Sequence, residues 1–177
     1  AKMNDPTGLV YDAAHNCLYV SDIGNHRIRQ VDLATQTVST VAGTGEAGFQ
    51  DGPAAQAKMY CPRGLVFDAA RNCLYFCDAA NHRIRKVDLA TQTVSTVAGT
   101  GEHGFLDGPA VQAKMNGPDG LVYDAAHNCL YFGDFVNQRI RKVDLATQTV
   151  STVAGTGEEG FQDGPAAQAK MGCPREV

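Results

Sequence analysis

Residues 17–42 read CLYVSDIGNHRIRQVDLATQTVSTVA, and nearly the same stretch recurs at 73–98 and again at 129–154. Leu9, Leu65 and Leu121 lie 56 residues apart, and the same interval separates the other matched positions. The chain therefore consists of three units, 1–56, 57–112 and 113–168, and residues 169–177 begin a fourth. Self-similarity at a fixed period of this size is the signature of a repeat architecture.

Each unit contains four short stretches rich in β-branched and aromatic residues, which in the first unit are 8–12, 17–21, 27–32 and 37–42. The short connections between them suit an antiparallel meander. A glycine-rich stretch follows at 43–53, and then a predicted turn of helix at 53–59. No unit has the long amphipathic helix of a parallel fold. The predicted fold is all-β, with three four-stranded antiparallel blades of a propeller.

Three motifs recur in the same order in the units and resemble the NHL repeat. In the first unit they are Pro6-x-Gly8-Leu9, the stretch 18–29, and Val41-Ala42-Gly43. The resemblance implies a six-bladed propeller with a binding role. Three blades are half of such a ring, and an open array would expose two apolar blade faces. We therefore expect a homodimer that closes the ring, with the duplicated segments 1–3 and 169–171 competing for one groove at the junction.

The composition excludes some classes of partner. The net charge of −4 disfavours a nucleic-acid partner, and no apolar run approaches the roughly 18 residues of a membrane span. Neither a signal peptide nor a glycosylation sequon is visible. Together with cysteines expected to be buried and unpaired, this favours a cytoplasmic location.

Several motifs have a structural interpretation that we prefer to a functional one. Residues 43–48, GTGEAG, match the dinucleotide fingerprint, but no βαβ unit surrounds them, so we expect turn glycines and no cofactor. Asp22 and Asn25 recur in every unit and are expected to accept backbone N–H groups in a turn. Arg27 and Arg29 are expected to pair with the acids of these turns.

The cysteines and histidines give no clear catalytic set. Cys17 and its equivalents in the other units are expected to be buried and inert, while Cys61 and Cys77 leave open a disulfide or a soft-metal site. No nucleophile, base and acid stand out together, so we expect no enzyme activity. A metal-dependent propeller lyase is an alternative. It would need converging histidines, for which His26, His82 and His103 are the candidates, with Gln138 in place of a further one.

The units differ from one another mainly at positions expected on a single face of the propeller. This face carries the connection between the second and third strands and the connection between blades. Because loops on a rigid scaffold commonly hold binding residues, we expect this variable face to recognise a protein, a peptide or a small polar ligand. The alternative is an engineered or fragment scaffold that only self-assembles. The candidate residues are Asp5, Thr7, Ser21, Ile23, Gly24, His26, Tyr60, Arg63, Cys77, Ala79, His82, His103, Asp119, Phe135, Val136, Gln138 and Glu159.

Overall fold

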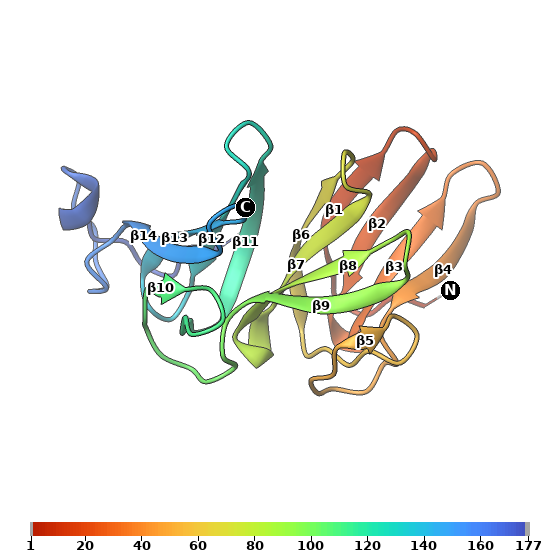
Figure 1. Cartoon of the computed structure of the whole chain (residues 1–177), viewed down its shortest axis with the longest axis horizontal. Coiled ribbons are helices and arrows are strands. Elements are labelled where there is room, and N and C mark those ends of the chain that lie inside the picture. Colours follow the sequence, from red (N-terminus) through yellow and green to blue (C-terminus); the bar gives the residue numbers. More distant parts are fainter. Residues whose placement is uncertain (1, 176–177) are drawn as a thin grey trace.

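A computed structural model describes residues 2–175 as three antiparallel sheets set side by side (Figure 1). Each sheet is one propeller blade whose strands follow one another in chain order, so the predicted all-β meander is confirmed. Blade 1 consists of β1 (Pro6–Asp12), β2 (Cys17–Asp22), β3 (Arg27–Asp32) and β4 (Thr37–Ala42). In the same order, blade 2 has β6 (Pro62–Asp68), β7 (Cys73–Asp78), β8 (Arg83–Asp88) and β9 (Thr93–Ala98), and blade 3 has β11 (Pro118–Asp124), β12 (Cys129–Asp134), β13 (Arg139–Asp144) and β14 (Thr149–Ala154).

Blades 2 and 3 each gain a fifth strand that comes from the preceding unit. The two-residue strand β5 (Gly52–Pro53) pairs with β9, and β10 (Gly108–Pro109) pairs with β14. The expected turn of helix at 53–59 is shorter than predicted, and its first residue also belongs to β5. Pro53 lies in an edge strand, a position that suits a residue without a backbone N–H group. Only a single hydrogen-bonded turn follows, in which the Ala57 amide donates to the Pro53 carbonyl at 2.9 Å.

Three short 3₁₀ turns complete the described elements. They are η1 (Ile23–Asn25), η2 (Ala79–Asn81) and η3 (Ala166–Gln168). The first two join the second and third strands of blades 1 and 2. The third lies in the loop after β14, at the place that corresponds to the single turn after Pro53 in the first unit.

The first strands of neighbouring blades approach closely, and glycines make this possible. Gly8 has φ +58°, and a Cβ atom placed on it would lie 2.8 Å from the Leu65 backbone nitrogen. Gly64 stands in the same relation to Leu121, at 2.7 Å. A side chain at either glycine would therefore push β1 from β6, or β6 from β11. The recurring Pro-x-Gly-Leu motif accordingly encodes the contact between adjacent blades.

The apolar core consists of two clusters, each centred on one junction between blades. Leu65 is 2% exposed at the first junction, where it packs in one cluster with Ile28 and Phe76. Leu121 is 4% exposed at the second junction. Leu9 occupies the equivalent position in blade 1 and is 63% exposed, since no blade among the described residues packs on that side of β1. Burial therefore follows the junctions rather than the sequence, which is nearly identical in the three units.

Candidate ligand-binding face

The connections that vary between units lie together at one end of the blades. In blade 2 the amides of Ala79 and Ala80 donate to the carbonyls of Cys61 and Tyr60, at 3.4 and 3.2 Å. The Val136 amide makes the matching bond in blade 3. Each 3₁₀ turn or its counterpart is thus bound to the segment that enters its own blade. The expected single face is present, and we call it the variable face.

A side chain at one variable position links each blade to the next. His26 Nδ1 accepts a hydrogen bond from the Cys61 amide at 3.4 Å, and His82 Nδ1 accepts one from the Gly117 amide at 3.2 Å. In blade 3, Gln138 Oε1 accepts from the Cys173 amide. Two residue types therefore make the same contact. Three of the predicted ligand-binding residues, His26, His82 and Gln138, have this structural role.

The link in blade 2 is sensitive to protonation. Burial, and then the nearby His103, lower the pKa of His82 from 6.5. The unfolded chain therefore binds the proton more readily than the folded chain does. Stability from His82 should be complete above about pH 6.5 and should decline as the pH falls toward the lower folded pKa.

We expect His82→Gln to keep the link and remove this pH dependence, because Gln138 already makes the same contact in blade 3. Urea unfolding of the two proteins between neutral pH and pH 5 measures the difference. The parent should lose more stability on acidification than the variant, by up to about 1.4 kcal/mol for each unit of pKa difference. Equal losses in the two proteins would contradict the assignment.

The recurring pair of Asp22 and Asn25 has a structural role, as expected, although the asparagine side chain donates its hydrogen bond to the carboxylate. In blade 2 the carboxylate of Asp78 accepts the Tyr60 amide at 2.7 Å and the Asn81 side chain at 2.9 Å. Arg85 donates to the same carboxylate at 2.7 Å. This confirms that the second arginine of the motif pairs with the acid of the turn. The first arginine instead donates to a backbone carbonyl, as Arg83 does to Thr100 at 2.6 Å.

A cavity of about 310 Å³ opens on the variable face between blades 2 and 3. Apolar side chains from the turns of both blades form much of its wall, and Val136 among them is 50% exposed. Arg63 and Asp119 form an ion pair in the wall, with 3.3 Å between Nη1 and Oδ2. The cavity brings together these residues from the predicted set: Arg63, Ala79, His82, Asp119, Phe135 and Val136.

The cavity also contains residues outside the set of predicted ligand-binding residues. Arg175 lies over the Phe135 ring, with its guanidinium carbon 4.1 Å from the ring centroid. Cys61, Ala80, Asn116 and Gly117 complete the wall. Cys61 and Gly117 occupy the position of Asp5, and Arg175 occupies that of Thr7; both positions vary between units in the sequence.

The other predicted residues do not line this cavity. Ser21 and Cys77 are fully buried and Ile23 is 5% exposed, so none of the three presents its side chain to a ligand at the surface. The remaining residues stay near the variable face but do not line the cavity. Tyr60 packs edge-on against His26, with 5.3 Å between ring centroids, and His103 packs likewise against His82 at 6.0 Å. Asp5, Thr7, Gly24 and Glu159 are exposed.

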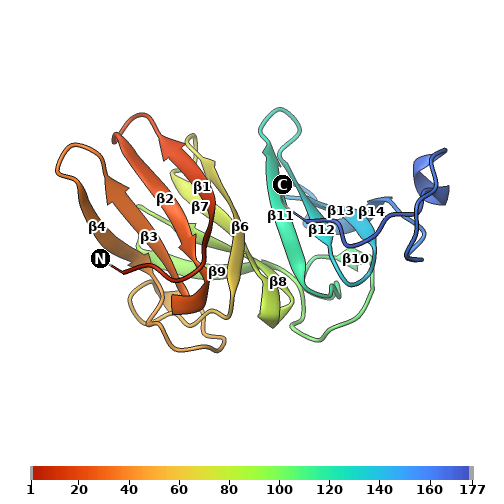
Figure 2. The same cartoon turned by 180° about the vertical axis from the view of Figure 1, so that it is seen from behind.

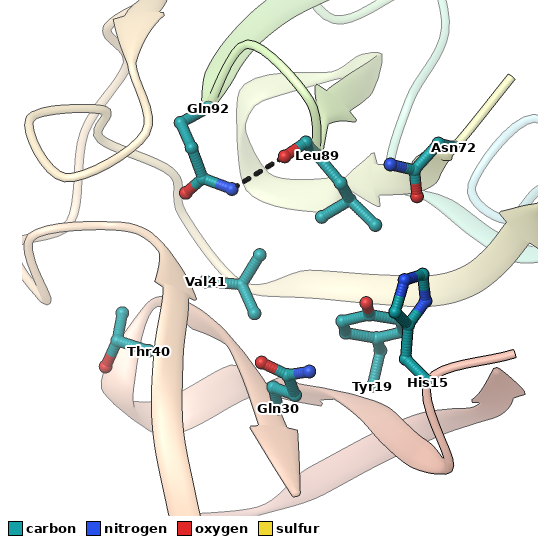
Figure 3. A pocket seen from close by; sticks show the side chains of 8 residues that line it. All are labelled: His15, Tyr19, Gln30, Thr40, Val41, Asn72, Leu89 and Gln92. Carbon is teal, nitrogen blue, oxygen red and sulfur yellow. Dashed lines mark hydrogen bonds between the residues drawn. The ribbon is translucent and has the colours of Figure 1, made fainter. Parts of the chain in front are cut away.

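The sequence analysis missed a groove that lies between adjacent blades. Between blades 1 and 2 it measures about 270 Å³, and Figure 3 shows the side chains that line it. In this groove Gln92 donates to the Leu89 carbonyl at 2.9 Å. An equivalent groove of about 540 Å³ lies between blades 2 and 3, where Arg71 replaces His15 and Lys86 replaces Gln30. These two differences between units could have indicated the groove in the sequence, although the turns around them are almost identical.

The cysteines are mostly part of the core. Cys17, Cys73 and Cys129 are buried as expected, and burial raises the pKa of the Cys73 and Cys129 thiols. No disulfide joins cysteines within residues 2–175. In the same part of the chain, no three or more His, Cys, Asp or Glu side chains form a group that could hold a metal ion. No helix in these residues is long and apolar enough to cross a membrane.

Comparison with known proteins identifies the architecture. The chain superimposes on an auxiliary nutrient binding protein from Bacteroides thetaiotaomicron with a TM-score of 0.74 and 21% identity, covering 97% of this chain and 42% of that one. No family model matches the sequence. The three sheets, packed through their first strands and completed by a strand from the preceding unit, are consecutive blades of a β-propeller.

The relatives identify the kind of blade. NHL repeat-containing protein 2 from Bos taurus is 33% identical over 177 residues, which cover 93% of this chain and 24% of that protein. The protein of the same name from Homo sapiens is 33% identical over 172 residues, covering 90% and 24%. Over most of its length the chain is therefore similar to these NHL-repeat proteins. It spans about a quarter of the length of these curated relatives.

Proposed function

We propose that the chain is a non-enzymatic binding module that pairs with a second copy into a ring and recognises its ligand at the cavity of the variable face. One observation carries the proposal. The residues that line this cavity differ between units, whereas the blades that hold them are almost the same. A scaffold of this kind fixes the position of the loops and leaves their side chains available for recognition.

The chemistry of the cavity favours a ligand that combines an apolar group with a carboxylate. Phe135, Val136, Ala79 and Ala80 provide apolar surface. The two cationic side chains of the wall, Arg63 and Arg175, provide partners for an anionic group. Arg63 is 35% exposed and its contact with Asp119 is long at 3.3 Å, so a carboxylate is able to compete for it. A short peptide with a free carboxyl end meets both requirements.

Relatives and neighbours support a binding role. The solved structure with a TM-score of 0.74 is named an auxiliary nutrient binding protein, which is compatible with ligand capture by a propeller of this shape. The cavity wall holds Cys61, His82 and Asp119, but each is engaged or held inactive in a way that favours binding over catalysis. Burial raises the pKa of the Cys61 thiol, His82 Nδ1 accepts from the Gly117 amide, and Asp119 pairs with Arg63. We keep the alternative of a scaffold that only self-assembles as an outcome of the test.

The test uses acetylated tripeptides with a central leucine or phenylalanine and a free carboxyl end. Binding is followed by amide chemical shifts of the protein. We expect shifts at Ala80, Gly117 and Val136, which belong to the cavity wall. The double variant Phe135→Ala/Val136→Ala should raise the dissociation constant at least about tenfold, which is 1.4 kcal/mol.

This variant carries its own folding control. It gives blade 3 the Ala79-Ala80 sequence that blade 2 already holds at the same positions, so the scaffold accepts it. Gln148→Ala, in the groove between blades, should leave binding unchanged. If no tripeptide shifts the cavity amides, or if the shifts map to the groove, the cavity is not the binding site.

A further inference from the structure

The loop that follows each blade docks onto the next blade through a defined set of contacts. In the first junction, Asp51 accepts from the Arg85 side chain at 2.7 Å and from both the amide and the hydroxyl of Thr96, at 2.9 and 2.8 Å. The Phe49 ring lies under the Arg83 guanidinium, 3.7 Å from its carbon. Asp107 and Phe105 repeat these contacts at the second junction.

The loop after blade 3 has the same internal structure, but no blade follows it in the described part of the chain. We call residues 155–168 the donor loop. The Gly155 amide donates to the Ala166 carbonyl at 3.0 Å, as the Gly43 amide does to Ala54 at 2.9 Å. Phe161 is 88% exposed, whereas Phe49 and Phe105 are each 44% exposed. The donor loop is therefore already shaped for a contact that the described residues do not make.

Blade 1 offers the complementary surface. Its sheet has four strands in the described part of the chain, so the outer edge of β4 is unpaired, whereas β9 and β14 each pair with a fifth strand. Arg29 is 12% exposed and binds Asp22, while its equivalents Arg85 and Arg141 are fully buried by the preceding loop. Blade 1 thus lacks the contacts that the loop of a preceding blade provides.

The donor loop does not meet blade 1 of its own chain. Figures 1 and 2 place β4 and the donor loop at opposite ends of the array of blades, and η3 packs on β14. The occupant that matches the surface is the donor loop of a second copy. Its Asp163 meets the charge of Arg29, and its Gly164 and Pro165 have the sequence of the two strands that pair at the internal junctions.

We propose that each copy inserts its donor loop onto blade 1 of the other, where Gly164 and Pro165 form a fifth strand antiparallel to β4. The internal pairs Gly52 with Val94 and Pro53 with Thr93 set the register, so Gly164 faces Val38 and Pro165 faces Thr37. Asp163 binds Arg29 and Thr40, and Phe161 lies against Arg27. The contact is head-to-tail, and it closes at two copies for the six blades that the NHL resemblance implies.

This exchange rests on the proposed function, which includes a ring of two copies, and it names the segment that closes the ring. The donor loop ends before residues 169–171, which repeat 1–3. In the structure the N-terminal copy lies on blade 1, where Asn25 donates to the Lys2 carbonyl at 3.4 Å, and the C-terminal copy binds the donor loop, where the Lys170 amide donates to the Gln162 carbonyl at 3.1 Å.

Sedimentation equilibrium over a hundredfold range of concentration tests the exchange. The parent chain should sediment at twice the 18.8 kDa of one chain. Phe161→Ala/Asp163→Ala should raise the dissociation constant at least about tenfold, a change of 1.4 kcal/mol. Hydrogen exchange at the Val38 amide should be slow in the parent and fast in the variant.

The matched control is Phe49→Ala/Asp51→Ala, which removes the same two side chains inside one chain. It should lower the melting temperature and leave the mass at two chains. A parent mass of one chain at every concentration would overturn the proposal. So would a donor-loop variant that still pairs and still protects Val38, or an assembly that grows beyond two copies. No ligand is present in this experiment, so its failure would not bear on the cavity.

Discussion

Leu65→Lys is expected to abolish cooperative folding of the chain. Leu65 is 2% exposed at the junction between blades 1 and 2, in the same apolar cluster as Ile28 and Phe76. Loss of a buried leucine alone costs about 2–5 kcal/mol. An ammonium group placed in this apolar cluster adds a desolvation penalty. The sum approaches the 5–15 kcal/mol that stabilises a typical domain.

The measurement is urea unfolding followed by far-UV circular dichroism, with Leu9→Lys as the matched control. Leu9 holds the same place in blade 1 and is 63% exposed. At protein concentrations below the dissociation constant of the proposed pair, where Leu9 is exposed, its replacement should change stability by about 0.5 kcal/mol or less. A well-folded Leu65→Lys protein with a sharp transition would show that the junction between blades is not the core of this fold.

The sequence predicted the four main strands of each blade because each has its own local signal. Alternating and β-branched residues in 27–32 and 37–42 give strands at the bounds found in the structure. The fifth strand gave no such signal. Gly52 and Pro53 become a strand only because β9, from the next unit, offers them an edge. A scan within one unit does not reveal pairing that is set between units.

The variable face was predicted in position but less well in the roles of its residues. The equivalent residues His26, His82 and Gln138 were predicted to bind a ligand. In the structure, histidine and glutamine both supply a hydrogen-bond acceptor to the next blade, so these differences preserve a structural contact. Ser21 and its equivalent Cys77 lie in an apolar strand and are buried. The difference between these two residues therefore does not reach the surface. Residue identity alone does not separate these cases from Phe135, which does line the cavity.

Arg85→Ala is expected to destabilise the chain by about 3–5 kcal/mol, the usual cost of breaking a buried ion pair from one side. All five N–H groups of the buried Arg85 guanidinium are used. They donate to the carboxylates of Asp78 and Asp51 and to the carbonyls of Lys58 and Gln50, at 2.7–3.1 Å. One side chain therefore holds the loop from blade 1 against blade 2. Its removal leaves Asp78, which is fully buried, without its counter-charge.

The pH dependence identifies this mechanism. Burial raises the pKa of Asp78, and Arg85 opposes that rise. Without the arginine, the pKa of Asp78 in the folded chain should rise further above its unfolded value of about 3.8. A raised folded pKa means that the folded state holds the proton more tightly. The penalty is therefore absent below the unfolded pKa, and it grows as the pH rises through the folded pKa.

Urea unfolding of Arg85→Ala and the parent at pH 4 and pH 7 measures this effect. The stability difference between the two proteins should be smaller at pH 4, where Asp78 is largely protonated in the variant. Arg85→Ala/Asp78→Asn provides the control, because the asparagine removes the buried charge, and its stability difference from the parent should not vary with the charge of residue 78. If the loss in Arg85→Ala is equal at both pH values, the cost comes from lost packing and loop contacts, and Asp78 does not remain as an unpaired buried charge.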